Sequence, residues 1–192
     1  MENGLKDRLM EMADLLSQYK KVVIISDKNV AKIYLSGIRK QFKLMGSEVN
    51  TIVIPPGEES KSLGQAEDIY YKLVEFGITR SDLIVALGGG VVGDLVGFCA
   101  ATFLRGVDFV QIPTSLLAQV DSSVGGKVGV DVGFGKNLVG AFYQPKMVII
   151  DPEFLDTLDD HYLTDGMGEV IKYGCISSAK LFVRLMGFEY QE

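Results

Sequence analysis

Short apolar runs alternate along this chain with segments whose apolar residues recur at helical spacing. The runs occupy residues 22–25, 49–54, 83–87, 109–112 and 147–150. A short, mainly apolar run that ends at a polar residue or a turn is typical of a strand buried on both faces of a sheet. Strands that alternate with helices form parallel sheets covered by helices on both sides. The sequence therefore predicts an α/β, Rossmann-like fold with a parallel sheet.

Helices are expected between these runs. The apolar positions of the first helix are Leu5, Leu9, Met12 and Leu16, and further helical faces lie within residues 30–45 and 63–74. Gly46 and Gly77 follow these two faces and are predicted to end them, as glycine often does. An apolar helix is expected directly after the three glycines at 88–90.

In sheets of this kind, ligands bind beyond the carboxyl ends of the strands. Four distinctive segments of this chain directly follow expected strands, and we therefore expect them along one edge of the sheet. They are Asp27, Pro55-Pro56-Gly57-Glu58, Gly88-Gly89-Gly90 and Pro113-Thr114-Ser115.

The composition excludes several classes of protein. Hydrophobic residues make up 47% of the 192 residues, which is too many for a disordered chain. Acidic residues outnumber basic ones by 25 to 19, which argues against a nucleic-acid partner. There is one histidine, His161, and Cys99 and Cys175 form no C-x-x-C pair, so neither a histidine-rich metal site nor a disulfide framework is expected. Free cysteines favour a reducing compartment, and we expect a cytoplasmic protein.

Residues 83–104 form an almost wholly apolar stretch with the length of a transmembrane helix. The glycines at 88–90 would weaken such a helix, and Asp94 would lie near the middle of the bilayer at a cost of roughly 2.5–3.5 kcal/mol. A buried strand, a tight turn and a buried helix fit this stretch better. The N-terminus lacks the basic start and apolar run of a signal peptide, so no membrane partner is expected.

The segment 88–94 (GGGVVGD) suggests a phosphate site. Glycines between a strand and a helix let the backbone approach a phosphate, and the helix N-terminus supplies N–H donors. The string does not match G-x-G-x-x-G, so a tight turn without a ligand stays open. Asp94 is predicted either to favour the helix dipole or to accept a hydrogen bond from a ligand. Asp27 is predicted either to hold a ribose diol or to cap the next helix.

Residues 121–137 combine Asp121 with two lysines that each follow a glycine, Lys127 and Lys136, and end in Asn137. A lysine is a good charge partner for phosphate, and glycine lets that partner come close. Asp121 is suited to accept hydrogen bonds from substrate hydroxyls. The segment is predicted either to bind a phosphate or to form a glycine-rich hairpin with surface lysines.

Glu169 and Lys172 are three residues apart and are predicted to share one helical face. They form either a surface ion pair or, in the functional interpretation, a metal ligand and a substrate contact. His161 is expected in a solvated loop. The polar turn at residues 57–61 is expected to be a solvated loop that ends in a serine helix cap.

Taken together, these strings resemble the 3-dehydroquinate synthases, a group of the sugar-phosphate cyclases. The resemblance runs from about Gly4 to Ser178 and is most specific in a series of ordered matches. These are residues 88–94 (GGGVVGD), 105–107 (RGV), 111–123 (QIPTSLLAQVDSS), 125–127 (GGK), 135–140 (GKNLVG) and 144–145 (QP).

The resemblance implies an NAD⁺-dependent lyase of the shikimate pathway that also needs a divalent metal, zinc or cobalt. Its substrate would be the sugar phosphate 3-deoxy-D-arabino-heptulosonate 7-phosphate, and its products 3-dehydroquinate and phosphate. NAD⁺ would transiently oxidise one ring hydroxyl while the protein orients the substrate and balances its charge. A homodimer is implied too, because this family lends an arginine, here Arg105, to the phosphate of the neighbouring subunit.

The resemblance also implies roles for individual residues. Cofactor contacts are implied for Asp27, Glu58, Lys61, Gly89, Gly90, Asp94, Thr114, Ser115, Lys127, Lys136, Phe154, Leu155 and Thr157. Substrate contacts are implied for Asp121, Lys127, Asn137 and Lys172, with Arg105 acting across the dimer, and Glu169 would be the carboxylate that binds the metal.

Members of this family begin with an extra strand and continue into a helical domain that supplies two histidine metal ligands. We therefore expect residues 1–158 to form an NAD-binding α/β domain, and residues 159–192 to form the first helices of a truncated second domain with exposed apolar surface. Such a chain is expected to lack turnover, because one carboxylate does not make a metal site. The alternatives are a non-catalytic NAD-binding or dimerising module, a related cyclase such as 2-deoxy-scyllo-inosose synthase, and a polyol dehydrogenase.

Overall fold

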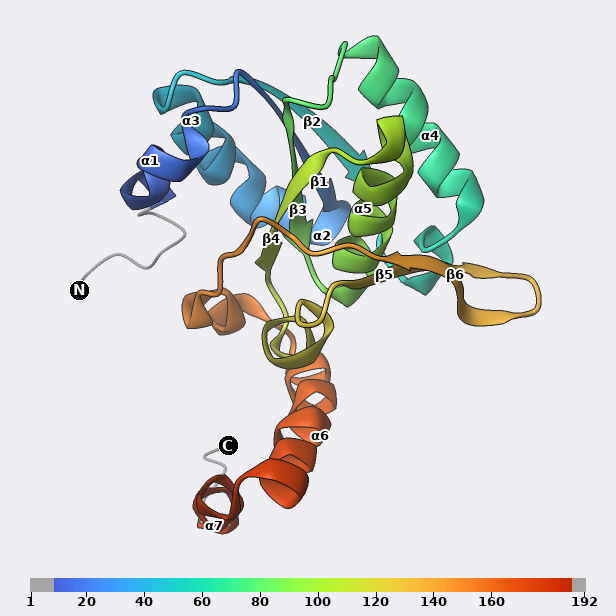
Figure 1. The fold of residues 1–192 in the computed structure, drawn as a ribbon. Coiled ribbons are helices and arrows are strands. Elements are labelled where there is room, and N and C mark those ends of the chain that lie inside the picture. Colours follow the sequence, from blue (N-terminus) through green and yellow to red (C-terminus); the bar gives the residue numbers. More distant parts are fainter. Residues whose placement is uncertain (1–8, 188–192) are drawn as a thin grey trace.

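A five-stranded parallel sheet forms the centre of the protein in a computed structural model, which describes residues 9–187 (Figure 1). The strand order is β2-β1-β3-β4-β7, and every neighbouring pair is parallel. The strands are β1 (Lys21–Asp27), β2 (Glu48–Ile54), β3 (Leu83–Gly88), β4 (Asp108–Pro113) and β7 (Met147–Val148). The predicted α/β, Rossmann-like class is confirmed.

Helices cover both faces of this sheet. The α-helices are α1 (Ala13–Leu16), α2 (Lys28–Val30), α3 (Ser36–Leu44), α4 (Leu63–Glu75), α5 (Gly90–Thr102), α6 (Asp160–Ser177) and α7 (Ala179–Met186). Short 3₁₀ or π-helical segments are η2 (Leu9–Met12), η3 (Ala31–Leu35), η4 (Glu58–Ser60), η5 (Phe103–Arg105), η6 (Ala118–Ser122) and η7 (Pro152–Thr157). Helices α1 and α3 lie on one side of the sheet, and α4 and α5 lie on the other (Figure 1).

Three predicted elements differ from the structure. From residue 9 on, the first helix is a 3₁₀ segment followed by one α-helical turn, and Leu5 lies outside the described residues. The second helix is interrupted by the π-helical segment η3. The fifth strand is two residues long, because β7 pairs with β4 only at Met147 and Val148.

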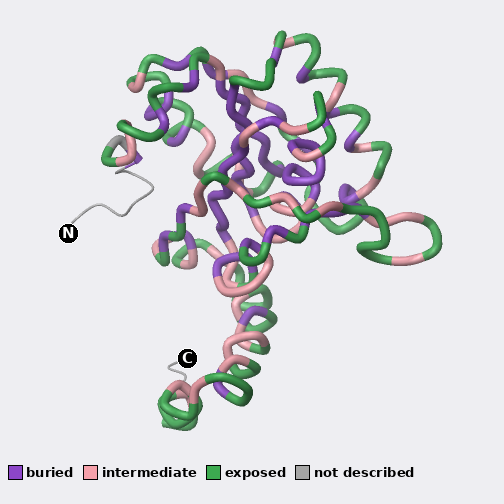
Figure 2. The backbone as a smooth tube through the Cα atoms, in the orientation of Figure 1, coloured by how far each residue is buried: buried purple, intermediate pink, exposed green. Residues whose placement is uncertain are grey.

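The core follows from the alternation of side chains along strands that are buried on both faces. Successive residues of a strand point to opposite sides of the sheet. In β1, Val23 and Ile25 join the cluster beneath α4 and α5, whereas Val22 and Ile24 join the cluster that contains Phe42 of α3. Figure 2 shows the buried residues concentrated in the sheet. This arrangement explains why the strands read as continuous apolar runs instead of alternating ones.

The carboxyl ends of the strands meet at one edge, as predicted. Asp27 at the end of β1 pairs with Ile54 at the end of β2, and Gly88 at the end of β3 pairs with Pro113 at the end of β4. Strand β1 leads to β2 on one side and β3 lies on its other side, so the strand order reverses at this point. Ligands of open α/β sheets bind at such a reversal.

An antiparallel hairpin of β5 (Lys127–Val132) and β6 (Gly135–Phe142) packs against α5. Val128 and Val130 of β5 are buried in the core, whereas β6 is largely exposed. The helix approaches the hairpin closely at Gly97, where an added Cβ would lie 2.4 Å from a methyl group of Val128. Residues 127–142 therefore form a hairpin, as one of the two alternatives predicted, and phosphate binding by this segment stays a prediction.

Helices α6 and α7 extend away from the sheet (Figures 1 and 2). They expose large apolar side chains, as predicted for this part of the chain. The most exposed are Tyr162, Ile176, Val183 and Met186. Within residues 9–187, no helix is both long enough and apolar enough to cross a bilayer. Cys99 and Cys175 are both free thiols, as predicted.

The close packing of β5 against β6 can be tested by substitution of a glycine. A Cβ on Gly140 would lie 2.3 Å from the carbonyl oxygen of Val128, a backbone atom that cannot move aside. We expect Gly140→Ala to lower the free energy of unfolding by about 1–3 kcal/mol, the usual cost of overpacking. Gly133→Ala in the same hairpin is the control, because nothing lies within 4 Å of a Cβ there. Urea denaturation measures both, and equal stability of the two variants would contradict the packing.

Candidate functional site

The site begins where β3 turns into α5. A Cβ on Gly89 would lie 3.3 Å from Ser115 Oγ, and a Cβ on Gly90 would lie 3.1 Å from Ser122 Oγ. Neither glycine has a positive φ, so close approach rather than left-handed backbone is the reason for glycine here. The first N–H groups of a 13-residue helix face this narrow space, and they have no partner within the helix.

One turn further into α5, Asp94 forms a buried ion pair. Lys61 Nζ lies 2.5 Å from Asp94 Oδ2 and 2.5 Å from Asn137 Oδ1, and Lys61 is only 5% exposed. Burial raises the pKa of the Asp94 carboxyl above its ordinary value of 3.8, while the hydrogen bond from Lys61 lowers it in part. The turn is exposed at Gly57, Glu58 and Glu59, as expected, but Ser60 and Lys61 are buried instead of solvated. Ser62 caps α4, as a serine was expected to do.

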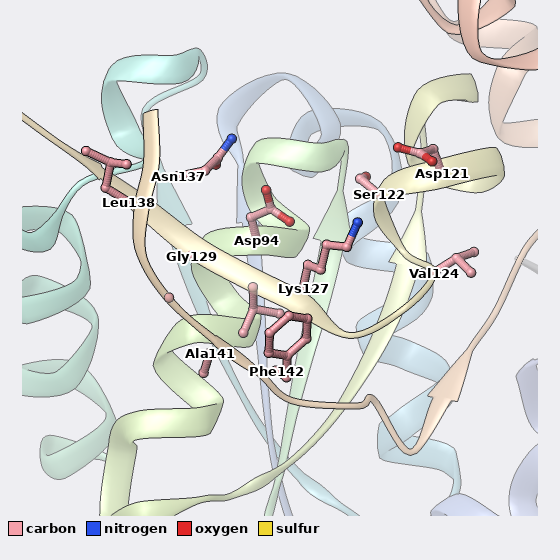
Figure 3. Close-up of a pocket in the computed structure, with 12 residues that line it drawn as sticks. Asp94, Asp121, Ser122, Val124, Lys127, Gly129, Asn137, Leu138, Ala141 and Phe142 are labelled. Carbon is pink, nitrogen blue, oxygen red and sulfur yellow. The ribbon is translucent and has the colours of Figure 1, made fainter. Parts of the chain in front are cut away.

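A pocket of about 560 Å³ lies between α5, the hairpin and η6 (Figure 3). Its polar lining includes Asp94, Asp121, Ser122, Lys127 and Asn137. In Figure 3 the ammonium group of Lys127 and the carboxylate of Asp94 face the same hollow. The structure thus brings together five polar groups that come from three separate elements. Four of them, all except Ser122, were predicted from the sequence as site residues.

Helix α6 adds a second group of charges beside this pocket. A Cβ on Gly166 would lie 2.7 Å from the backbone nitrogen of Leu117, so this glycine lets α6 pack closely against the segment that carries Asp121. Tyr173 donates a 2.8 Å hydrogen bond to Asp121 Oδ1, which raises the pKa of the phenol. Lys172 Nζ lies 3.6 Å from the same oxygen and also pairs with Glu169. The predicted shared face of Glu169 and Lys172 is confirmed.

Asp27 lies at the edge where the strand order reverses. Its Oδ1 accepts hydrogen bonds from the backbone nitrogens of Asn29 and Val30, at 2.8 and 3.2 Å, and so caps α2. Asp27 therefore does cap this helix, and its contact with a ribose diol stays a prediction. Glu58 and Lys136 form an exposed ion pair at 3.2 Å. The two residues are far apart in the sequence.

The remaining predicted residues lie on both sides of this edge. Thr114 follows β4, and its backbone nitrogen donates to the carbonyl of Gly88 at 3.0 Å, which holds the two strand ends together. Phe154 is buried in η7 and packs edge to face on Tyr34, with ring centroids 4.8 Å apart. The Tyr34 hydroxyl lies 2.5 Å from Thr157 Oγ1. Leu155 lies between these two η7 residues.

Two residues lie away from the pocket. Arg105 follows the C-terminal end of α5, about 20 Å along a 13-residue helix from the glycines at its start. Leu104 and Arg105 both have left-handed backbone, with φ of 50° and 65°. His161 is exposed in the first turn of α6, so the prediction of a loop is wrong. Asp159 caps that helix by accepting from the His161 backbone nitrogen.

The described residues do not fit a metal ion on their own. Within residues 9–187, no group of three or more His, Cys, Asp or Glu side chains is placed to hold one. Glu169 instead pairs with Lys172. Zinc normally takes three protein ligands even in catalytic sites. We therefore derive no chemical step through a metal from this part of the chain.

Besides Ser122, the sequence assigned no role to two further polar residues near the site. Tyr173 orients the Asp121 carboxylate, and Asp131 accepts a 2.7 Å hydrogen bond from the backbone nitrogen of Asn137. Tyr173 directly follows Lys172, but neighbours in a helix do not face the same way, so the spacing carried no signal. Asp131 comes six residues before Asn137, and only the hairpin register brings the two together.

Comparisons with known proteins show which proteins this chain resembles. Residues 51–165 match the profile of the family described as 3-dehydroquinate synthase N-terminal. The chain is 57% identical to a 3-dehydroquinate synthase from Clostridium acetobutylicum, covering 98% of this chain and 53% of that protein. It is 58% identical to one from Clostridium perfringens, covering 100% of this chain and 55% of that protein. The chain thus spans about half the length of the curated relatives it matches.

Solved structures of two synthases have the same fold. A 2-epi-5-epi-valiolone synthase from Streptomyces hygroscopicus, with NAD⁺ and Zn²⁺ bound, is 30% identical with a TM-score of 0.86, over 94% of this chain and 51% of that one. A 2-deoxy-scyllo-inosose synthase complexed with carbaglucose-6-phosphate, NAD⁺ and Co²⁺ is 30% identical with a TM-score of 0.77, over 82% of this chain and 43% of that one.

The Asp94 carboxyl provides a test of the buried pair. Its ¹³C NMR titration midpoint is expected above 3.8, and higher still in Lys61→Met, because that variant removes the cation that lowers the pKa. Lys72→Met, on the exposed side of α4, should leave the midpoint unchanged. Since the native pKa exceeds the unfolded one, this carboxyl favours folding most below pH 3.8 and loses that contribution as pH rises through the native pKa. A midpoint at or below 3.8 would show that burial does not outweigh the effect of Lys61 on the pKa of Asp94.

Proposed function

Because the chain belongs to the 3-dehydroquinate synthase family, we propose that it is the nucleotide-binding part of an enzyme that converts 3-deoxy-D-arabino-heptulosonate 7-phosphate into 3-dehydroquinate and phosphate. The observation that carries the proposal is the pocket where Asp94, Lys127 and Asn137 meet beside the glycine-rich start of α5. It combines a phosphate-binding cation, an amide and a carboxylate in one hollow. A phosphorylated polyol needs all three kinds of group.

NAD⁺ is the proposed cofactor, and the carboxyl edge of the sheet fits it. The backbone at Gly89 and Gly90 is suited to approach a pyrophosphate, because side chains there would meet serine hydroxyls within 3.3 Å. Asp27 is suited to a ribose diol. The 30% identical valiolone synthase with NAD⁺ bound supports this assignment. When bound, NAD⁺ would supply a reversible hydride acceptor for a ring carbon of the substrate.

The other cofactor contacts that we propose lie around the same edge. Glu58 and Lys136 form an ion pair there, and Phe154 is buried beneath Tyr34. The full proposed set beyond Asp27, Gly89 and Gly90 is Glu58, Asp94, Thr114, Ser115, Lys127, Lys136, Phe154, Leu155 and Thr157. The resemblance also assigns Lys61 to the cofactor, but its ammonium group is engaged by Asp94 and Asn137.

The residues of the pocket have distinct roles in this proposal. Lys127 and Asn137 bind the substrate phosphate, and phosphate leaves with the electrons of its C–O bond. The ammonium group of Lys127 therefore stabilises the negative charge that develops on the leaving group. Asp121, oriented by Tyr173 at 2.8 Å, accepts hydrogen bonds from substrate hydroxyls. Lys172, 3.6 Å from Asp121, adds a further cation.

Arg105 acts across a homodimer in this proposal. It lies outside the pocket of its own subunit, on a turn where two successive non-glycine residues have left-handed backbone. Such strain costs of order 1–3 kcal/mol per residue and is often retained at functional sites. We place the enzyme in the cytoplasm, where free cysteines such as Cys99 and Cys175 stay reduced.

A divalent metal, zinc or cobalt, would complete the enzyme. Glu169 is the one ligand that we assign to it from this chain. The cyclases of known structure that contain Zn²⁺ or Co²⁺ support the assignment. We assign the other ligands to the part of the family's relatives that this chain does not match. We assign to the same part a helical domain that packs on the exposed apolar residues of α6 and α7.

A second candidate function is a non-catalytic NAD-binding or dimerising module. The observation that favours it is the absence of a three-ligand metal group within residues 9–187. Such a module would bind NAD⁺ without releasing phosphate from any substrate.

Two substitutions of Asp27 distinguish its proposed role in cofactor binding from its role as a helix cap. We expect Asp27→Asn to weaken NAD⁺ binding about tenfold, because a charged hydrogen-bond partner is lost. Its melting temperature should stay nearly unchanged, because Asn caps a helix as well as Asp does. Asp27→Ala should in addition lose about 1 kcal/mol of stability with the cap. Calorimetric titration with NAD⁺ and thermal melts measure this, with Asp68→Asn on exposed α4 as the control. Unchanged affinity in Asp27→Asn would leave Asp27 with its capping role alone.

The activity is tested in a chimera in which this chain replaces the matching part of the Clostridium acetobutylicum enzyme, with which it shares 57% of residues. We expect the chimera to release phosphate from the heptulosonate phosphate, and Lys127→Met to reduce the rate roughly 100-fold, as loss of one transition-state contact does. The 192-residue chain alone, with NAD⁺ and zinc, should release none.

Three outcomes would contradict this. Normal turnover by the chain alone would show that it needs no further domain. A chimera that binds NAD⁺ without turnover would favour the non-catalytic module. A chimera that prefers glucose 6-phosphate would favour the inosose synthase alternative.

A further inference from the structure

The free end of the β5–β6 hairpin lies outside the core, yet it carries Asn137. Phe134 at its tip is 98% exposed, and Leu138 is 63% exposed, so apolar packing does not hold this end in place. The other end of the hairpin is anchored by buried Val128 and Val130. Some other interaction must fix Asn137 relative to α5.

Lys61 makes that interaction. Its ammonium group lies 2.5 Å from both the Asp94 carboxylate and the Asn137 side-chain oxygen, and it is almost completely buried. A buried cation forms strong hydrogen bonds, and its removal would leave Asp94 buried without its cation. Lys61 therefore joins helix α5 to the hairpin through one charged group.

The backbone around Lys61 reinforces the same contact. The Asp131 nitrogen donates to the Lys61 carbonyl at 2.8 Å, and Ser62 forms an isolated parallel bridge with Asp131. Asp131 in turn accepts from the Asn137 nitrogen at 2.7 Å. Asn137 is thus held at its side chain by Lys61 and at its backbone by Asp131. This matters because Asn137 has left-handed backbone, with φ of 58°.

We propose that Lys61 is a positioning residue, which locks the free end of the hairpin, and with it Asn137, against helix α5. The resemblance assigns Lys61 to the cofactor, whereas its ammonium group is already engaged by two protein side chains. The same ammonium touches the cofactor-side Asp94 and the substrate-side Asn137, so it sets the two subsites relative to each other. The role of Asn137 toward substrate rests on the proposed function, but the lock itself does not.

The lock is tested without any ligand by amide hydrogen exchange of the chain. Lys61→Met should speed exchange of the Asn137 and Asp131 amides by about tenfold, the factor that corresponds to 1.4 kcal/mol. The amides of the anchored end, such as Val130, should keep their rates. Lys72→Met, an exposed lysine of α4, should change neither. Unchanged exchange at Asn137 in Lys61→Met would overturn the proposal.

If Lys61→Met fails to fold, Asn137→Ala provides a second test. Asn137 is exposed, so its substitution leaves the core intact. It removes the same bond from the other side and should speed exchange at residue 137 by a similar factor. In the double variant the two effects should not add, since residues that act through one contact are coupled. Additive effects would mean that Lys61 does not act through Asn137.

The chimera provides the functional measurement. If Lys61 acts by positioning Asn137, Lys61→Met should raise the KM for the heptulosonate phosphate several-fold in the wild-type background and leave it unchanged in Asn137→Ala. Equal effects in both backgrounds, together with weaker NAD⁺ binding, would identify Lys61 as a cofactor contact and overturn the proposal. Faster hairpin exchange in a chimera that releases no phosphate would contradict the proposed function and leave the lock standing.

Discussion

All six residues of β3 are buried, so this strand has to be covered on both faces and paired on both edges. Its neighbours β1 and β4 meet the second requirement, and the two apolar clusters on opposite faces meet the first. Because all strands are parallel, this burial also decides where the chain is polar. Polar side chains and unpaired backbone groups lie at the ends of the strands, and the carboxyl ends share one edge.

The site is built at that edge by close approach and by charge. Gly89 and Gly90 bring the start of α5 within contact distance of Ser115 and Ser122, and Gly166 brings α6 close to Leu116 and Leu117. Charged side chains then join elements that apolar packing does not hold. Lys61 joins α5 to the hairpin, and Asp121 joins η6 to α6 through Tyr173. Polar contacts therefore hold the free end of the hairpin and η6 in place, whereas α5, β5 and the sheet are held by the apolar core.

The class of fold, the strands of the sheet and the shared edge could all be predicted from the sequence, because each depends on local pattern. Buried strands read as apolar runs, and glycines mark the ends of α3 and α4 at Gly46 and Gly77, both of which have positive φ. The limits of β7 and the break in the second helix were not predictable. Both depend on which other elements pack against the segment, and that is decided only when the sheet is assembled.

The sequence by itself determined which chemical groups are available and that four of the segments carrying them lie at one end of a parallel sheet. It also determined the family, through the ordered matches from residue 88 to residue 145. Only the tertiary structure decided which groups meet. Lys61 lies 33 residues from Asp94 and 76 from Asn137, and Asp121 lies 52 from Tyr173. Contacts across such separations depend on hairpin register and helix packing, and residue spacing along the chain carries no record of either.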